Sequence, residues 1–478
     1  MSQASLRMRL SFFRIATVIT LFSLAAHAQT PEGHRISARI QGLKDTTLYL
    51  AHFYGPTQYI PRDTARVDGS GNLVFDGPKA LPGGLYMVVG GGRPLLELVI
   101  GEQNFSFETD TANFIGKMKV TGSRENEAFY TYQQFLNERF SAMRGIQARS
   151  QPGGDAAARQ AAQTQMAALQ KEVMEYRKAF LAKNEGLLTV KFLKAMAEPE
   201  VPKAPTLPNG RPDSAFVFNY YKNHFFDGFD FSDERMVRTP FLQQKLDRFI
   251  KDLTVQTSDS LIKSGDFVVQ KAKANKDVLS YTIWYLTSQY EQPKVVGTDG
   301  FYVHMVEKYW LTGVMPIQDT ASLRSLRERV TVIKPLLPGK TLPNLSLQDT
   351  LGRYRALHDI KAPYTVVYFY DPECGHCRES APKLKQFYDT FKAKGIQVYL
   401  IAIDKEPTKW KNFIREFKLQ NLTNVYGPSS QTPINFRQRY DVYSTPTVYV
   451  LDQNKKILAR HLPVEDLGGY IDYLQRKK

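Results

Sequence analysis

The segment DPECGHCRESAP (371–382) contains both cysteines of this 478-residue chain, Cys374 and Cys377. It follows TVVYFY (365–370), a continuous apolar run typical of a buried central strand. The residues after Cys377 predict a helix that ends at Gly395, because glycine readily adopts the backbone conformation that terminates helices. Cys374 is therefore expected where a strand ends and a helix begins, with Cys377 in the first helical turn.

A cysteine pair at this spacing is compatible with a redox couple, half of a metal site or a small structural disulfide. A thiolate at a helix start is stabilised by free amide groups and by the helix dipole, so Cys374 is the candidate nucleophile and Cys377 the candidate resolving thiol. A structural zinc site needs four ligands, and the chain has no second cysteine pair. A disulfide across so short a loop removes little entropy from the unfolded chain. The redox couple is favoured, and no metal or organic cofactor is predicted.

Two charged neighbours are expected to tune the nucleophile. His376 lies between the cysteines, and its positive charge would favour the thiolate and make the disulfide more oxidising. Glu373 directly precedes Cys374, and its negative charge would raise the pKa of that thiol. The two effects oppose each other, so the sequence leaves the redox direction open.

The remainder of the C-terminal region alternates strands and helices. VYLIAID (398–404) predicts a second buried strand, and TKWKNFIREF (408–417) predicts another helix. TVYVLD (447–452) and ILAR (457–460) predict a closing hairpin before a final helix. Strands and helices around one sheet define an α/β domain, and the proline-containing stretch KPLLPGKTLPN places the start of this domain near residue 334.

The front of the chain shows two other patterns. Residues 29–122 contain short strand-like runs and the hairpin loop signal DGSGN (68–72), and they predict an antiparallel β-sandwich. Residues 123–333 are predicted to be helical, with a helical hairpin whose second helix begins at Asp155. A dimerising coiled coil stays open as the alternative. Five apolar residues of that second helix have the spacing of one helical face: Met166, Leu169, Val173, Tyr176 and Phe180.

Residues 1–28 have the features of a secretion signal. A basic start precedes the apolar run IATVITLFSLAA (15–26), which is too short to span a bilayer comfortably. Small residues then end at Ala28, where cleavage is expected. An uncleaved anchor helix is the alternative. The mature protein is predicted to be exported to the periplasm or cell envelope, where disulfides can persist.

Charge and composition narrow the classes of partner. The formal net charge is +16, which is compatible with peripheral association with an acidic membrane surface. The basic residues are scattered along the chain, and no helix-turn-helix, zinc-finger or RNA-binding motif accompanies them. No nucleic-acid partner is predicted.

Two segments together resemble the thioredoxin superfamily. YFYDPECGHCRESAP (368–382) is similar to the family's active-site strand and helix, in which Pro382 matches the proline that kinks the helix. YSTPTVYVLD (443–452) resembles the loop that carries a cis-proline, here Pro446. The insertion between the two segments resembles the TlpA/ResA branch of exported thiol–disulfide oxidoreductases.

The resemblance implies a fold class and an activity. The expected fold is multidomain α+β, with an N-terminal antiparallel β-sandwich (29–122), a central helical region (123–333) and a C-terminal α/β thioredoxin-like domain (334–478). The expected activity is exchange of disulfides with protein dithiol or disulfide substrates, through a redox-active Cys374–Cys377 pair. Thr445 and Pro446 would bind the substrate backbone. A membrane-bound electron donor or acceptor would recycle the pair.

Two positions differ from the thioredoxin pattern, and a third argues against a related class of enzyme. Tyr368 stands where thioredoxins place a buried Asp that helps to deprotonate the second cysteine, and Asp404 or Glu373 is a candidate substitute. Glu373 also replaces the aromatic residue that usually precedes the first cysteine. A thiol peroxidase is disfavoured, because Asp371 stands where that class needs Thr. The main alternative is an envelope binding or scaffold protein whose thioredoxin-like unit serves docking or redox sensing.

Overall fold

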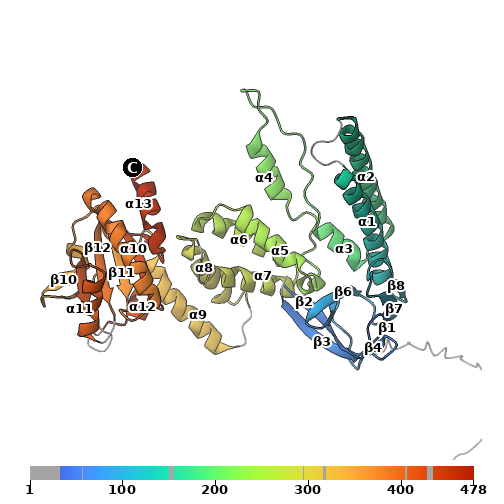
Figure 1. Ribbon diagram of the computed structural model, residues 1–478, viewed down its shortest axis with the longest axis horizontal. Coiled ribbons are helices and arrows are strands. Elements are labelled where there is room, and N and C mark those ends of the chain that lie inside the picture. The colour runs from blue at the N-terminus through green and yellow to red at the C-terminus, as the bar shows by residue number, and fades with distance from the viewer. Residues whose placement is uncertain are drawn as a thin grey trace, which may run out of the picture.

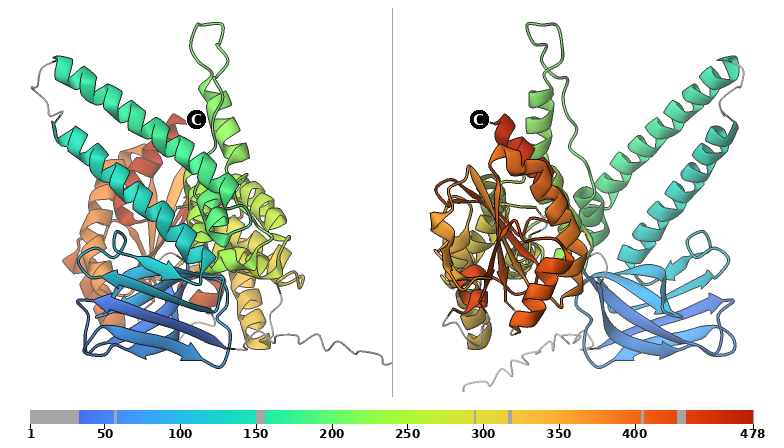
Figure 2. Two further views of the ribbon diagram at one scale, coloured as in Figure 1. Left: turned by 90° about the vertical axis from the view of Figure 1, so that its right-hand side faces the viewer. Right: turned by 60° about the vertical axis from the view of Figure 1, so that its left-hand side comes forward.

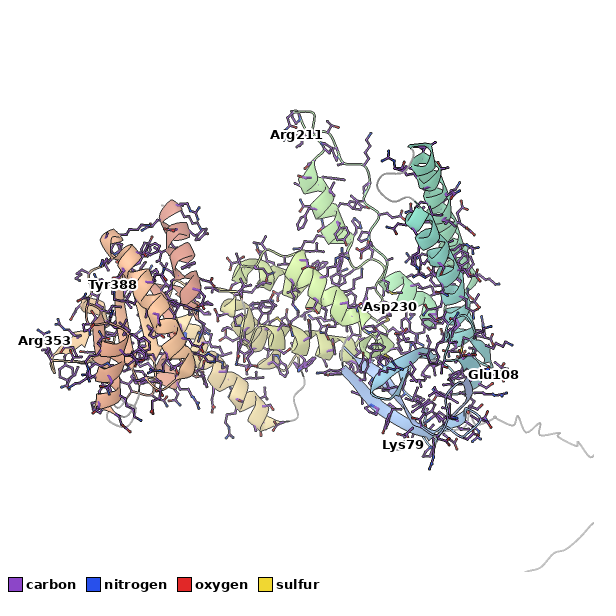
Figure 3. All side chains as sticks on the ribbon, viewed as in Figure 1. Lys79, Glu108, Arg211, Asp230, Arg353 and Tyr388 are labelled. Carbon is purple, nitrogen blue, oxygen red and sulfur yellow. The ribbon has the colours of Figure 1, made fainter. Side chains whose placement is uncertain are left out.

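The computed structural model describes residues 33–55, 58–149, 156–293, 295–315, 319–403, 406–427 and 434–477. The predicted signal peptide, Asp155 and Asp404 lie outside these ranges. The described parts form an elongated molecule, with the strands of the N-terminal region at one end and the C-terminal sheet at the other (Figure 1). Labelled side chains mark the two ends: Lys79 and Glu108 lie in the N-terminal region, and Arg353 and Tyr388 lie in the C-terminal domain (Figure 3).

The N-terminal strands form two four-stranded sheets that enclose one apolar core. The strand orders are β4-β1-β7-β8 and β3-β2-β5-β6. Alternating residues of both sheets point into the core, as Ile36 of β1 and Leu50 of β2 do. The strands are β1 (His34–Gln41), β2 (Thr47–Tyr54), β3 (Gln58–Arg66), β4 (Asn72–Gly77), β5 (Gly84–Gly90), β6 (Arg93–Ile100), β7 (Asn104–Asp110) and β8 (Lys119–Thr121).

The predicted sandwich is present, with two differences in detail. The β1 and β7 strands pair in parallel, whereas the other strand pairs of the two sheets are antiparallel. The turn at 68–72 is not a hairpin loop, because it joins β3 in one sheet to β4 in the other. A tight turn has the same local sequence whether its flanking strands pair or separate, so the sequence could not decide this. The β3 strand was not predicted, since most of its residues are polar and exposed.

Two long helices form an antiparallel hairpin that projects from the sandwich, as both views of Figure 2 show. They are α1 (Arg124–Arg149) and α2 (Ala156–Lys183). The Phe135 and Tyr176 rings stack at 3.6 Å between centroids, and Phe180 is buried in a small cluster at the base. The predicted apolar face of α2 therefore packs against α1 within one chain, which is the helical hairpin expected from the spacing.

Helices of the central region pack on the outer face of the sheet that contains β2, β5 and β6. Their core includes Phe53, Met87 and Val99 from those strands, so this sheet is covered on both sides. The aromatic run after residue 224 contributes Phe225 and Phe226 to the same core. The main helices are α3 (Leu188–Ala195), α4 (Ser214–His224), α5 (Phe241–Asp247), α6 (Ser258–Ala272), α7 (Lys276–Gln289), α8 (Asp299–Met305) and α9 (Thr320–Ile333).

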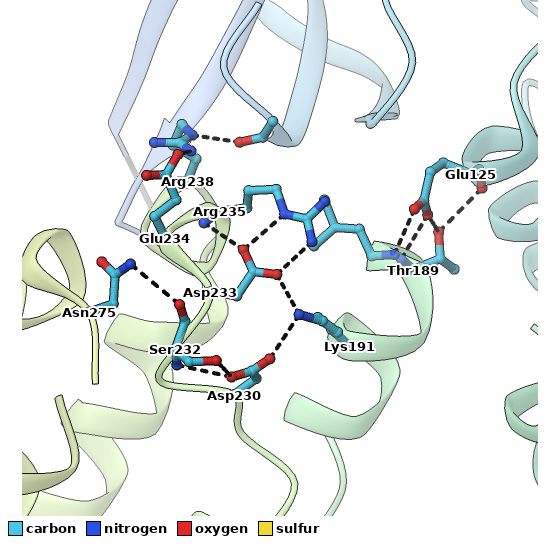
Figure 4. A network of polar contacts seen from close by, with 12 residues as sticks. Glu125, Thr189, Lys191, Asp230, Ser232, Asp233, Glu234, Arg235, Arg238 and Asn275 are labelled. Atoms are coloured by element: carbon cyan, nitrogen blue, oxygen red, sulfur yellow. Dashed lines mark hydrogen bonds and ion pairs between the residues drawn. The ribbon is translucent and has the colours of Figure 1, made fainter. Parts of the chain in front are cut away.

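A network of ion pairs lies where the sandwich, the hairpin and the central helices meet (Figure 4). The Asp233 carboxylate accepts from Arg235 and from Lys191, whose Nζ lies 2.7 Å away. Nearby, the buried Glu125 carboxylate accepts from the backbone N–H groups of Leu188 and Thr189 at the start of α3. These contacts join α1, α3 and the segment before α5 into one unit.

The C-terminal domain is a seven-stranded mixed sheet in the order β10-β9-β13-β12-β11-β14-β15. The central strands β11, β12 and β13 are parallel, and β14 is antiparallel to β11. The strands are β9 (Ser346–Asp349), β10 (Tyr354–Ala356), β11 (Tyr364–Tyr370), β12 (Gln397–Ala402), β13 (Thr423–Tyr426), β14 (Thr447–Asp452) and β15 (Ile457–Arg460).

Helices cover both faces of this sheet. The buried side chains of α10 (Gly375–Phe391), α11 (Pro407–Glu416) and α13 (Leu467–Arg476) pack on one face. Those of α12 (Phe436–Tyr440) and of the segment around Leu342 pack on the other. This layered arrangement is the predicted α/β domain. Among the described helices, none is both long and apolar enough to cross a membrane.

Candidate functional site

Cys374 lies at the position that the sequence predicted for a nucleophile. It occupies the N-cap of α10, four residues after the end of β11, and its side chain is partly buried. Gly395, with a φ of 78°, ends the helical segment at the other end. Both cysteines are free thiols in this structure.

The environment of Cys374 favours its thiolate. Partial burial opposes ionisation, but a hydrogen bond with Thr445 and the backbone N–H groups of Cys377 and His376 outweigh it, so the pKa of Cys374 is lowered. The Cys374 thiol also donates to the Thr445 carbonyl oxygen at 3.2 Å. Cys377 is fully buried, and loss of solvation raises the pKa of its thiol to about 12. The two thiols are thus chemically different: one ionises readily and one stays protonated.

Tyr368 fills the position beneath Cys377 where a buried Asp was missing. Its side chain is fully buried, and its hydroxyl lies 2.7 Å from Ser380 Oγ and 3.4 Å from the Cys377 carbonyl oxygen. Burial raises the pKa of Tyr368, so the phenol stays neutral. Of the two substitutes considered, Asp404 lies outside the described residues.

The two predicted tuning residues differ in what they contact. Glu373 pairs with Lys409 Nζ at 2.7 Å, so its charge is compensated by a residue of α11. The His376 imidazole is exposed, and its Nδ1 lies 3.6 Å from Glu379. His376 reaches the Cys374 sulfur through its backbone N–H rather than through its ring. No local motif pointed to Lys409, because it is 36 positions away from Glu373.

Thr445 and Pro446 lie next to the cysteines, as the family resemblance implied. The Thr445–Pro446 peptide bond is cis. Pro446 lines a cavity of about 310 Å³ together with His376, Ser380 and His461. The cis-proline loop, defined here as residues 441–446, therefore borders both the reactive thiol and an open cavity beside it.

A buried ion-pair chain holds this loop against the helical region. The Asp441 carboxylate is fully buried and pairs with Arg329 of α9, with Arg460 Nη2 at 2.9 Å and with His461. Arg460 in turn pairs with Asp299 of α8 at 2.9 Å. Sequence reasoning missed all of these residues, since single charged residues far apart in the chain form no motif. No cluster of His, Cys, Asp and Glu suited to a metal ion occurs among the described residues.

A thioredoxin-type sheet with a cysteine pair at the start of its first helix defines the class of this domain. Comparisons with known proteins agree. A model described as the AhpC/TSA family matches residues 338–460. Two models described as domains of unknown function, DUF5106 and DUF4369, match residues 157–333 and 34–129.

Known relatives match the C-terminal domain. Thiol-disulfide oxidoreductase ResA of Bacillus thuringiensis (strain Al Hakam) is 26% identical over 140 residues, which cover 28% of this chain and 76% of that protein. A domain of a possible thiol-disulfide isomerase from Cytophaga hutchinsonii is 41% identical, with a TM-score of 0.28, and the match covers 30% of this chain and 96% of that domain. A thioredoxin-like protein from Bacteroides caccae is 17% identical, with a TM-score of 0.46, over 58% of this chain and 99% of that one.

The C-terminal domain belongs to the TlpA/ResA-like family of thioredoxin-like proteins. Its enzyme class is thiol–disulfide oxidoreductase.

Proposed function

We propose that this chain is an exported thiol–disulfide oxidoreductase that exchanges disulfides with protein partners of the cell envelope through its CGHC motif. One observation carries the proposal: Cys374 caps the start of α10 with its thiol 3.2 Å from the Thr445 carbonyl, while Cys377 lies buried behind it. The inferred parts of the chain are a signal peptide (1–28), a β-sandwich (29–122), a helical region (123–333) and the redox domain (334–478).

In the reducing direction the Cys374 thiolate attacks a substrate disulfide. A mixed disulfide forms, and one substrate sulfur leaves as a thiolate. Cys377 then loses its proton and attacks Cys374, which releases the second substrate thiolate and leaves a Cys374–Cys377 disulfide. Two electrons pass from the enzyme to the substrate. A membrane-bound dithiol donor would restore the reduced pair, and in the oxidising direction the same steps run in reverse with an acceptor.

Six residues have supporting roles in this proposal. Thr445 and Pro446 bind the backbone of the substrate next to its cysteine. Ser380 and Tyr368 hold the carbonyl of Cys377, which keeps the second thiol beneath the first. His376 and Glu373 tune the nucleophile through the N–H and the ion pair described above.

The test uses residues 29–478 in an insulin-reduction assay with dithiothreitol, together with redox titration against glutathione. We expect turnover by the wild-type chain and a loss of at least about 100-fold in Cys374→Ser, since no other described thiol can replace the nucleophile. A Cys377→Ser variant should accumulate mixed disulfides with envelope proteins. Equal rates for wild type and Cys374→Ser would contradict the enzyme, and an active enzyme that traps no partner would favour the scaffold.

A further inference from the structure

A basic groove lies on the redox domain, at the opposite end of the molecule from the β-sandwich. It has a volume of about 690 Å³ and is lined by the β9–β10 hairpin, by α11 and by the start of β13. Figure 3 labels one of its residues, Arg353, at the outer edge of the domain. The groove shares no lining residue with the cavity that contains Pro446, so it is a separate feature of the surface.

Positive charge exceeds negative charge in this groove. Its lining contains four cations, Arg353, Arg355, Lys411 and Arg415, and one carboxylate, Asp349. Arg353 and Arg355 pair with Asp349 at 3.2 and 3.0 Å. Loss of solvation opposes ionisation of Asp349, but the Arg353 backbone N–H and the two guanidinium groups outweigh it and lower its pKa to about 2. Asp349 therefore cancels one of the four positive charges.

The two cations of α11 keep their charge uncompensated. Lys411 and Arg415 are four positions apart, so they lie on one face of the helix. Neither has a carboxylate partner in the described parts of the chain, and Arg415 contacts only the Asn412 amide. The acidic residue at the end of α11, Glu416, pairs with Arg378 of α10 and does not line the groove. An anion is thus attracted to this face of α11.

The hairpin tip beside the groove exposes two large apolar side chains. Leu351 and Tyr354 are each 71% exposed, the highest values among the large apolar side chains of the described residues. They belong to β10 and to the turn before it, and β10 is the edge strand of the sheet. An apolar tip with basic residues behind it is typical of segments that enter a membrane interface.

A surface of anionic phospholipid matches both parts of this patch. Its phosphate groups would accept hydrogen bonds from the lysine and arginine side chains of the groove. Leu351 and Tyr354 could enter the boundary between headgroups and acyl chains, where a tyrosine ring is favoured. A free phosphate ester would use the groove but leave the apolar tip in water. The tip therefore favours a lipid surface as the occupant.

We propose that Leu351, Arg353, Tyr354, Lys411 and Arg415 form a docking patch that binds the redox domain to a membrane surface containing anionic phospholipid. The inference goes beyond the proposed function, because docking uses neither thiol. The net positive charge of the chain thereby has a specific place of contact, on the redox domain.

Docking at this patch would bring the reactive thiol close to a membrane-bound electron donor or acceptor. Lys409 of α11 pairs with Glu373, which directly precedes Cys374. A helix advances 1.5 Å per residue, so Arg415 lies roughly 9 Å further along α11 than Lys409. One short helix therefore links the docking patch to the exchange site.

The test measures co-sedimentation of residues 29–478 with vesicles of phosphatidylcholine alone or of an equal mixture with phosphatidylglycerol. We expect the partition coefficient to be at least about tenfold higher for the mixed vesicles and to fall as salt is added. Lys411→Gln combined with Arg415→Gln should lower it about tenfold. Leu351→Ser combined with Tyr354→Ser should lower it by a similar factor, of about tenfold.

Matched substitutions elsewhere control for charge and for apolar surface. Lys79→Gln combined with Lys119→Gln removes two exposed cations from the β-sandwich, at the other end of the molecule. Met174→Ser combined with Val255→Ser removes two apolar side chains that are 65% and 69% exposed. Both control variants should bind within about twofold of the wild type, since charges away from the lipid surface are screened. Thermal unfolding checks that every variant is folded.

The outcomes separate docking from catalysis. Failure of the wild type to bind the mixed vesicles would overturn the proposal and would leave an acidic protein surface as the partner. Binding that is unchanged in either patch variant would also overturn it. Release by soluble glycerol phosphate, with no effect of Leu351→Ser and Tyr354→Ser, would make the groove a site for free phosphate esters instead. Cys374→Ser should bind vesicles like the wild type while losing insulin reduction, so the two proposals can fail independently.

Discussion

The reactivity of Cys374 depends on backbone groups that lie close to it in the chain and on Thr445, which lies far from it in the chain. Two backbone N–H groups of its own helix start favour the thiolate, and Thr445 adds a contact from 71 positions away. Cys377, only three positions along the chain, is fully buried and has a pKa raised to about 12. The pKa values of the two thiols thus differ because the Cys374 side chain faces the cis-proline loop and the Cys377 side chain faces the core.

This difference predicts the pH dependence of alkylation. The lowered pKa of Cys374 means that its thiolate is populated below the ordinary cysteine range near 8.5. Iodoacetamide should therefore modify Cys374 with a midpoint at lower pH than that of an ordinary cysteine, while Cys377 remains unmodified until alkaline pH. Mass spectrometry of the reduced protein across pH 5–10 measures both.

The Glu373–Lys409 pair should move that midpoint. Lys409→Met removes the cation that compensates Glu373, so the pKa of Cys374 should rise by less than about one pH unit, because the pair is solvent-exposed. Lys411→Met, two positions along α11, is the control and should have no effect. A midpoint that is unchanged in Lys409→Met would mean that Glu373 does not influence the thiol.

Helix α3 shows how one buried side chain can organise an element. The start of α3 has no capping side chain of its own, and the Glu125 carboxylate from α1 accepts from the Leu188 and Thr189 N–H groups at 2.6 and 2.9 Å. A carboxylate at a helix start is favoured by both the free amides and the helix dipole. Glu125 therefore replaces the missing local cap and ties α1 to α3.

Glu125→Gln should destabilise this part of the molecule. The substitution keeps the shape but removes the charge from a buried, charge-assisted contact, and we expect the free energy of unfolding to fall by about 1–3 kcal/mol. Chemical denaturation followed by circular dichroism measures it. Glu127→Gln, an exposed change in the same helical turn, should stay within about 0.5 kcal/mol. Equal effects of the two substitutions would contradict the capping role.

At the level of the whole molecule, the redox domain and the helices are joined by buried charges. Asp441 is surrounded by Arg329, Arg460 and His461. Burial alone would raise the pKa of Asp441, but these partners outweigh it, and the pKa is lowered. Because the cis-proline loop belongs to this junction, the arrangement of the domains and the position of that loop are coupled.

Acid should destabilise the junction between the redox domain and the helices. A carboxylate whose folded pKa is depressed stabilises the fold above its unfolded pKa near 3.9, and this contribution is lost as pH falls through the folded value. Asp441→Asn should lower the free energy of unfolding at pH 7 by about 3 kcal/mol and should abolish that part of the acid dependence. Denaturation at pH 7 and at pH 3 measures both effects.

An exposed carboxylate provides the control for the acid experiment. Asp252→Asn, in the helical region, should change the free energy of unfolding by less than about 0.5 kcal/mol and should retain the acid dependence of the wild type. If Asp441→Asn keeps the wild-type acid dependence, the junction is not stabilised by this carboxylate.

The sequence alone determined the features that depend on neighbours along the chain. The apolar run 365–370 specified a buried strand, and the cysteine spacing after it specified a thiol pair at a helix start. The 3–4 spacing from Met166 to Phe180 specified a helix with one apolar face. Local patterns of this kind suffice because side-chain periodicity and helix termination act over a few residues.

The tertiary structure decided what depends on residues far apart. Three contacts are examples, because nothing in the local sequence of one partner indicates the other. They are the ion pair of Glu373 with Lys409, the parallel pairing of β1 with β7 and the ion pair of Asp441 with Arg329. The chemistry of the thiols could be predicted from a short segment, whereas the ion pairs that hold the cis-proline loop beside them arise from packing.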